Sequence, residues 1–339
     1  MKPHSLGQIV VAFFRNHLAN QKGLSENTIA TYSHCIKLFL NFCCQQLKQS
    51  IDHLSFENIN DKMVLDFLDH LENQRQNIPR TRNARLATIR AFFRFLATQE
   101  PTMIDICQRI CSIKQKKTPH KIVESLDDQE LKVFFEGIDP NTKGGARDYA
   151  LIHMLYNTGA RVQELVDLNI SAIRLDSVAQ VKLTGKGSKE RLVPLWPDTV
   201  EAIKNYLDHR KNENIQHPKL FLNGSNNSIT RFGIRHLIKK YKKQFEKRCP
   251  SLKNKSVSPH TFRHTTARHL LRSGVDIFGV KEWLGHAHVN TANHYVELDI
   301  DMKRKALEAS KPYKKYKHSK PNWTKPDVMK FLEKITKVA

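Results

Sequence analysis

One stretch of the chain, residues 258–296, holds side chains that could act together on a phosphodiester. They are His260, Arg263, His286 and Tyr295. His260 and Arg263 stand three residues apart, so they would share one face of a helix. His286 follows Arg263 by 23 residues, and Tyr295 follows His286 by nine. Imidazoles, a guanidinium and a phenol that converge on one small site would suit an oxyanion and a nucleophile.

Phosphoryl chemistry gives each of these groups a task. A guanidinium fork can hold the non-bridging oxygens of a phosphate bidentately, and an imidazole can donate hydrogen bonds or move protons near neutral pH. A tyrosine can attack phosphorus, but its phenol has an unperturbed pKa of about 10. Nearby positive charge or a base must therefore assist it.

Metal and disulfide chemistry are the weaker interpretations. His260 and His264 have the spacing of paired zinc ligands, yet no Glu follows His260 as in H-E-x-x-H. The cysteines have no C-x-x-C spacing, and we expect them to stay reduced and to line apolar helix faces. They are Cys35, Cys43, Cys44, Cys107, Cys111 and Cys249. No metal and no cofactor is predicted.

The charge of the chain indicates a polyanionic partner. The 339 residues carry a formal net charge of +23, which favours nucleic acid first and an anionic membrane second. Neither a signal-peptide core nor an apolar span of about 20 residues is present. We therefore expect a cytoplasmic, nucleoid-associated protein, with no membrane partner and enough apolar residues for two domains.

Helical periodicity runs through the first third of the sequence. Apolar residues recur at helical spacing in Leu6 to Asn20, Asn27 to Leu47 and about Asp61 to Asn73, and Pro79 starts a fourth helix. That fourth helix carries arginines away from its apolar face, with scarcely an acidic residue before Glu100. A solvated face is the ordinary explanation, but the missing counter-charges favour phosphate contact. These arginines are Arg80, Arg82, Arg85, Arg90 and Arg94.

A basic segment, residues 112–124, separates the first domain from the second. Its little periodicity predicts a linker, and Lys114, Lys116 and Lys117 are candidate DNA contacts. Such a linker would let two basic domains close around a duplex as a clamp, although a simple soluble tether is also compatible with it.

The second domain begins with Asp127 and Glu130 in a first helical turn. A helix from Ala146 to Asn157 ends at a glycine turn that Arg161 follows, and Glu164 comes one turn later and could orient the guanidinium. An ordinary surface arginine is the alternative. Helices are also predicted over about 197–209 and 230–248.

Strand character in residues 180–183 and 191–195 flanks a glycine-rich hairpin with Lys186 at its tip. A tip lysine is most often only solvated. Here a mobile ammonium could also reach into a minor groove and protonate a leaving 5′ oxygen.

Taken in order and spacing, these residues resemble the signature of the tyrosine recombinases, the phage integrase family, and most closely its Xer-type and mobile-element members. The similarity covers about residues 5–310. The matching motifs are Arg161 in Gly-Ala-Arg-Val-Gln-Glu-Leu, Lys186 in Thr-Gly-Lys-Gly-Ser-Lys-Glu-Arg, His260 and Arg263 in Pro-His-Thr-Phe-Arg-His, His286 in Leu-Gly-His, and Tyr295.

The resemblance implies a mainly α, two-domain fold. It implies a helical core-binding domain over residues 1–111, the basic linker over 112–124, and an α+β catalytic domain over 125–310 with a small antiparallel hairpin or sheet. A last helix, about 302–309, would dock on a neighbouring protomer. Residues 311–339 depart from the family pattern, with nine lysines against two acidic residues. We expect a disordered basic tail, a DNA-touching arm or a partner-docking helix there.

The resemblance also implies site-specific recombination without metal or nucleotide, for integration or excision of a mobile element. Tyr295 would form a 3′-phosphotyrosyl link, Arg161 and Arg263 would clamp the phosphate, and Lys186 would act as general acid. His260 and His286 would position and exchange protons, and Glu164 would support Arg161. The expected partners are double-stranded DNA and other protomers, as a homotetramer on paired sites or with related recombinase subunits. An inactive architectural DNA-binding protein and a type IB topoisomerase-like relaxing enzyme are the alternatives.

Overall fold

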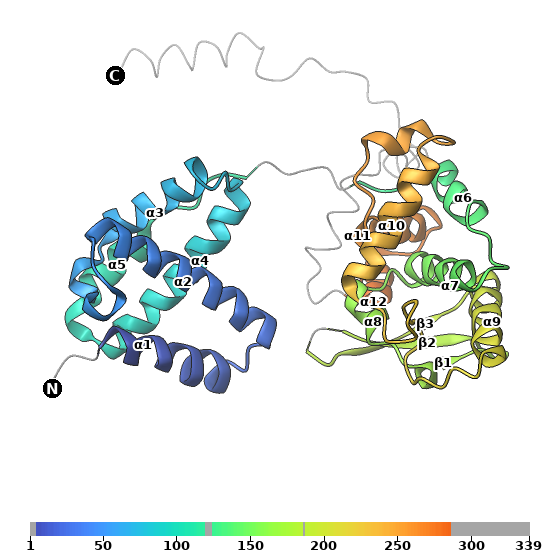
Figure 1. The fold of residues 1–339 in the computed structure, drawn as a ribbon, viewed down its shortest axis with the longest axis horizontal. Coiled ribbons are helices and arrows are strands. Elements are labelled where there is room, and N and C mark those ends of the chain that lie inside the picture. The colour runs from blue at the N-terminus through green and yellow to red at the C-terminus, as the bar shows by residue number, and fades with distance from the viewer. Residues whose placement is uncertain (1–4, 119–123, 186, 286–339) are drawn as a thin grey trace, which may run out of the picture. The chain divides into compact units, whose positions relative to one another are not determined.

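The computed structural model describes residues 5–118, 124–185 and 187–285. The chain divides into two compact units, Met1–Lys121 and Ile122–Ala339 (Figure 1). Each unit has its own apolar core. Within the described residues, no helix is long and apolar enough to cross a membrane.

The first unit is built from helices alone among its described residues. Its core is a set of stacked and edge-on phenylalanine rings, such as Phe13 against Phe92 at 5.1 Å and Phe39 against Phe67 at 5.2 Å between centroids. Cys35 lies buried on the second helix, as the helix-face interpretation predicts. The helices are α1 (Leu6–Ala12), the π-helix η1 (Phe13–Gln21), α2 (Glu26–Leu47), α3 (Asp61–Asn73), α4 (Pro79–Gln99) and α5 (Ile104–Ser112), with 3-10 turns η2 (Ile51–His53), η3 (Phe56–Asn58) and η4 (Pro101–Met103).

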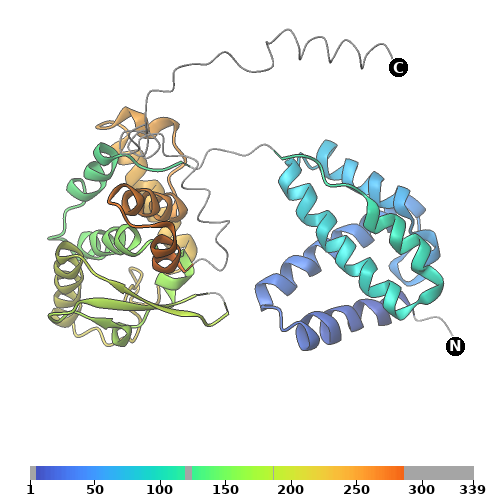
Figure 2. The ribbon, with the colours of Figure 1, turned by 180° about the vertical axis from the view of Figure 1, so that it is seen from behind.

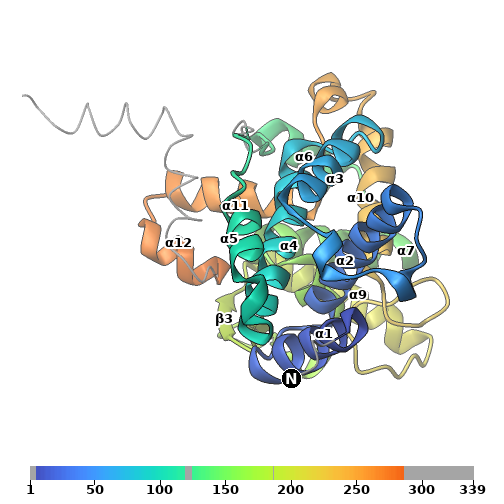
Figure 3. The same ribbon diagram turned by 90° about the vertical axis from the view of Figure 1, so that its left-hand side faces the viewer.

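Helix α4 organises this unit, because it contacts α2, α3 and α5. It lies beside α5 (Figure 3). Pro79 occupies its first turn, where the missing N–H costs nothing. Its buried face carries Leu86, Ile89, Phe93 and Leu96, the four residues that the periodicity assigned to it. The predicted start of this helix and both ends of α3 are confirmed.

The second unit packs helices against a small sheet. Strands β1 (Ile173–Arg174), β2 (Gln180–Thr184) and β3 (Glu190–Pro194) form an antiparallel sheet in the order β1-β2-β3, with Val181 opposite Val193. The sheet lies at one end of the unit in both opposed views (Figures 1 and 2). The helices are α6 (Asp128–Glu136), α7 (Lys143–Thr158), α8 (Val162–Val166), α9 (Pro197–Asn212), α10 (Arg231–Phe245), α11 (Pro259–Arg272) and α12 (Ile277–Leu284), with 3-10 turns η5 (Ile170–Ala172) and η6 (Pro250–Asn254).

Helix α7 lies at the centre of this unit and packs on α9 and α11. Its residues Leu151, Ile152 and Leu155 are fully buried, so the helix fixes the position of the turn that follows its C-terminus. The predicted mainly α fold with a small antiparallel sheet is therefore confirmed.

The structure differs from the sequence prediction in several elements, and helix α5 and strand β1 were not predicted. The expected single helix from Leu6 to Asn20 is α1 followed by η1, where the hydrogen-bond pattern widens from Phe13 onward. Helix α12 was not predicted, although Asp276 caps its start and Gly285, with φ of +64°, ends it. Its eight residues are too few for periodicity alone to distinguish a helix from a loop.

A buried histidine of α7 predicts acid sensitivity of this unit. The ring of His153 packs against the rings of Phe135 and Tyr149, with distances of 4.5 and 4.4 Å between ring centroids. Burial lowers the pKa of His153 to about 4, against a weaker opposing effect of Asp198. At a pH between about 4 and the ordinary histidine pKa of about 6.5, His153 binds a proton in the unfolded chain but not in the folded chain. The free energy of unfolding should therefore fall by about 3 kcal/mol as pH drops through this range.

The measurement is urea unfolding at pH 7 and pH 4, followed by tryptophan fluorescence. All three tryptophans follow residue 122, so the signal reports on the second unit. The control, His153→Phe, keeps an aromatic ring but cannot titrate. Between pH 7 and pH 4 its free energy of unfolding should fall by about 3 kcal/mol less than that of the wild type. Equal losses in the two proteins would contradict this assignment.

Candidate active site

Helix α11 presents two of the predicted residues. Ser258 caps its N-terminus and Pro259 occupies its first turn. Arg263 is only 3% exposed, and its guanidinium donates to the carbonyl oxygens of Gly159 at 2.7 Å and Leu284 at 2.6 Å. His260, one turn earlier, is exposed. The shared helix is confirmed, but the two side chains lie at different depths.

Arg161 stands at the start of α8, directly after the turn that ends α7. Gly159 adopts φ of +58° there, and a Cβ at this position would approach a side-chain carbon of Leu284 to 2.4 Å. The positive φ favours glycine, and a larger residue would also have to displace the end of the Leu284 side chain. The turn directs Arg161 toward Glu164, whose carboxylate accepts from Arg161 Nη1 at 2.9 Å and from its backbone N–H at 2.8 Å. Arg161 Nη2 donates to the Gly285 carbonyl at 3.0 Å.

The two guanidinium groups therefore donate to consecutive carbonyls, those of Leu284 and Gly285. This brings Arg161 and Arg263 together at the end of α12, although they are 102 positions apart in the sequence. The Arg161 side chain remains 34% exposed, so the pair offers positive charge to the surface of the unit.

Glu164 has a second arginine that the sequence reasoning missed as a site residue. Arg191 of β3 donates to both carboxylate oxygens, Nη1 to Oε1 at 3.1 Å and Nη2 to Oε2 at 2.7 Å. Burial opposes the ionisation of Glu164, whose side chain is 4% exposed. Hydrogen bonds and charge from Arg191, with smaller contributions from Arg161, outweigh burial and hold the pKa of Glu164 below its ordinary value.

Two glycines bring the neighbouring loops against this cluster. A Cβ on Gly185, at the end of β2, would lie 3.1 Å from Glu164 Oε1, and one on Gly285 would lie 3.0 Å from Arg191 Nη1. Gly185 and Gly285 directly precede Lys186 and His286 in the sequence. Lys186, His286, Tyr295 and the predicted helix near 302–309 lie outside the described residues, as does the 311–339 extension.

The charges around His260 favour its neutral form. Although His260 reaches the surface, the protein around its ring removes part of the surrounding water and lowers the pKa of His260, and the positive charges of Arg263, Arg235 and Arg161 lower it further. A neutral imidazole can accept a proton or donate one hydrogen bond. His260 and His264 have ring centroids 6.4 Å apart. Within residues 5–118, 124–185 and 187–285, no cluster of three His, Cys, Asp or Glu residues is arranged to hold a metal ion.

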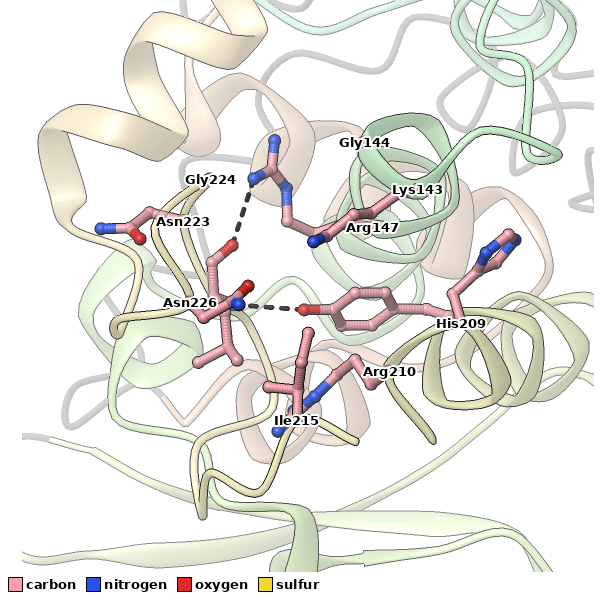
Figure 4. A pocket seen from close by; sticks show the side chains of 11 residues that line it. Lys143, Gly144, Arg147, His209, Arg210, Ile215, Asn223, Gly224 and Asn226 are labelled. Carbon is pink, nitrogen blue, oxygen red and sulfur yellow. Dashed lines mark hydrogen bonds between the residues drawn. The ribbon is translucent and has the colours of Figure 1, made fainter. Parts of the chain in front are cut away.

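A separate pocket lies between the start of α7, α9 and the loop after it (Figure 4). Its cations already have partners. Lys143 pairs with Glu213, Arg147 with Asp148 at 2.6 Å, and Arg210 donates to three backbone carbonyls. None of the predicted site residues lines this pocket, so it is not part of the cluster around Glu164.

The arginines of α4 divide into three kinds. Arg80 and Arg94 are exposed, and Arg85 and Arg90 are half-buried. Arg82 was expected on a solvent-exposed face of the helix, but its side chain is only 5% exposed. Its Nε atom lies 3.3 Å from the carboxylate of Glu72 in α3. The counter-charge comes from a neighbouring helix, which inspection of α4 alone could not reveal. We therefore assign Arg82 to this ion pair and not to the DNA-binding set.

The start of the basic linker is attached to the first unit. Lys116 exchanges two backbone hydrogen bonds with the Asn83 side chain, at 3.1 and 2.7 Å, and its ammonium lies 2.6 Å from Glu72. Lys114 and Lys117 are exposed. Residues up to Lys116 are thus fixed to α4 and do not act as a free tether.

Comparison with known proteins places these features in one family. Residues 124–302 match the phage integrase family, and residues 11–100 match the phage integrase N-terminal SAM-like domain. Tyrosine recombinase XerC of Anoxybacillus flavithermus is 33% identical over 304 residues, 88% of this chain and 96% of its own. Integrase/recombinase y4rC of Sinorhizobium fredii is 32% identical over 314 residues, which are 92% of this chain and 93% of its own.

The fold has matching solved structures. The Tn1549 transposon integrase, in complex with a circular intermediate DNA, matches with a TM-score of 0.67 over 88% of this chain and 99% of that one, at 15% identity. At this identity the match concerns the fold alone.

Proposed function

Since the chain belongs to the phage integrase family of tyrosine recombinases and is a site-specific recombinase, we propose that it cuts and rejoins DNA through a 3′-phosphotyrosyl intermediate. The observation that carries this proposal is the convergence of Arg161 and Arg263 on the consecutive carbonyls of Leu284 and Gly285. Two fixed guanidinium groups suit a phosphate whose negative charge increases in the transition state.

In the proposed reaction, the Tyr295 phenol oxygen attacks the scissile phosphorus. A bond from tyrosine to phosphorus forms and the bond to the 5′ oxygen breaks, with Lys186 giving that oxygen its proton. His260 or His286 accepts the phenol proton. A 5′ hydroxyl from a partner strand then attacks the phosphotyrosine and reverses each step, which conserves the bond energy and requires no nucleotide.

DNA is the proposed substrate, and a mobile element its proposed context. One solved structure of the same fold is a transposon integrase in complex with DNA, and this chain has a net charge of +23. We propose phosphate contacts from Arg80, Arg94, Lys114 and Lys117, which are exposed, and from Arg85 and Arg90, which are half-buried. Four protomers on two paired sites would supply the four strand cleavages that a full exchange needs.

The test uses a nicked duplex that carries the DNA end beside the encoding gene, which traps a covalent adduct. We expect a slowly migrating protein–DNA band on a denaturing gel and strand exchange between two such sites. Relaxation of supercoiled DNA by a monomer without exchange would identify a topoisomerase-like enzyme. Specific binding with no adduct would identify an architectural protein, and either result would refute the proposal.

The lowered pKa of His260 predicts how cleavage depends on pH. If His260 acts as a neutral imidazole, it should remain neutral at pH 7, and its contribution should be lost only as pH falls below the ordinary histidine value of about 6.5. The measurement is the ratio of the cleavage rates of wild type and His260→Gln from pH 5 to 8.5. This ratio isolates His260 from other titrating groups. A change in the ratio centred above pH 7 would contradict the prediction.

A further inference from the structure

Arg191 joins three segments of the candidate site. Its side chain is 9% exposed. One edge of the guanidinium donates to both oxygens of Glu164, and Nε donates to the Trp283 carbonyl at 2.9 Å. The Arg191 guanidinium therefore connects three segments: β3, the start of α8 and the end of α12. Because its donors point in fixed directions, it restricts the relative positions of these segments.

The contacts extend from Arg191 to the residues that would touch the phosphate. Glu164, held by Arg191, holds Arg161 at 2.9 Å. Gly285 adopts φ of +64° and packs against the Arg191 side chain so closely that a Cβ there would lie 3.0 Å from Nη1. The carbonyl of this glycine accepts from Arg161. Arg161 is thus fixed on two sides, through Glu164 and through Gly285, and Arg191 contacts both.

The charges assign different tasks to the two arginines. Arg191 is buried beside Glu164, whereas Arg161 is 34% exposed. A buried carboxylate needs a compensating charge, and Arg191 supplies it from inside the unit. Two guanidinium groups and one carboxylate carry a net charge of +1, so Glu164 orients Arg161 without cancelling the positive charge of the cluster.

We propose that Arg191 is a positioning residue for strand cleavage. It fixes the Arg161 guanidinium and the turn at residues 283–285 relative to the hairpin of β2 and β3. Arg191 itself does not touch DNA. The role rests on the proposed function, because Arg161 is the residue through which it acts.

The experiment compares Arg191→Gln and Arg191→Lys with the wild type on the nicked duplex. The cleavage rate is measured at saturating protein concentration, and the dissociation constant for the nicked duplex is measured separately. We expect Arg191→Gln to cleave slower by a factor on the order of 100, with an unchanged dissociation constant. Lysine keeps the charge but cannot donate bidentately, so Arg191→Lys should also be slow. The matched control is Arg174→Gln in β1, which removes an exposed arginine–carboxylate pair and should cleave normally.

A double-mutant cycle identifies the residue through which Arg191 acts. If the path runs through Glu164, the double variant Glu164→Gln, Arg191→Gln should be no slower than the slower single variant. Multiplicative losses would overturn the proposal, as would wild-type cleavage by Arg191→Lys. Melting temperatures check folding. If Arg191→Gln does not fold, Arg191→Lys and the double variant, which leaves no buried carboxylate without its Arg191 partner, decide the question.

The outcomes separate the two proposals. A wild-type protein that forms no adduct refutes the proposed function, and the role of Arg191 fails with it. A wild-type protein that forms the adduct, with Arg191→Gln equally fast, refutes the role of Arg191 alone.

Discussion

Tyr295→Phe is expected to bind DNA as the wild type does and to form no covalent adduct at all. The substitution removes a single oxygen atom, the one that would attack phosphorus, and leaves the aromatic ring. No other group in the proposed reaction can take its place, because imidazole and ammonium groups at the site handle protons. The measurement is the denaturing-gel assay on the nicked duplex, with binding followed separately on a native gel.

Two tyrosines further along the chain provide matched controls. Tyr313 and Tyr316 lie among lysines and follow no comparable cluster of histidine and arginine. Tyr313→Phe and Tyr316→Phe should therefore form the adduct at the wild-type rate. An adduct in Tyr295→Phe that disappears in one of the control variants would show that the nucleophile lies elsewhere.

Local sequence signals predicted the position of Arg161 well. The glycine turn after α7 and the acidic residue one turn beyond indicated an oriented guanidinium, and the structure has Gly159 at positive φ and Glu164 bonded to Arg161. Such features depend on residues within a few positions of one another. The turn residue and the cap are therefore visible in the sequence.

The contribution of Arg191 could not be predicted in the same way. Its partner Glu164 is 27 residues earlier, and no periodicity states which strand meets which helix. A partial signal was present, because Arg191 alternates with Leu192 and so shares a strand face with the buried Val193. An arginine on an inward face needs a buried acceptor. Only the tertiary structure identifies that acceptor.

The same limit applies to Arg82 in the first unit. Its place on α4 follows from the sequence, but the Glu72 carboxylate that pairs with it belongs to α3. A count of acidic residues along one helix therefore overestimates how many of its arginines are available to phosphate. To judge which arginines of a helix are free of counter-charges, the acidic residues of the neighbouring helices must be considered as well.

Arg263→Lys should slow cleavage by a factor on the order of 100 to 1000, the range for loss of one preorganised donor at a developing oxyanion. The guanidinium of Arg263 spans two carbonyls from different segments, Gly159 and Leu284, at 2.7 and 2.6 Å. An ammonium is a compact charge without the planar fork, so it cannot keep both contacts and the same orientation toward a phosphate. Charge alone is therefore expected to be insufficient.

This substitution should also affect stability, because a buried carbonyl that loses its donor costs about 1–3 kcal/mol. The control is Arg268→Lys on the same helix, where the arginine donates to the Ser125 hydroxyl at 3.2 Å. Cleavage at saturating protein and melting temperature are measured for both variants. A folded Arg263→Lys protein that cleaves at the rate of Arg268→Lys would mean that positive charge, and not the geometry of the fork, is what the phosphate requires.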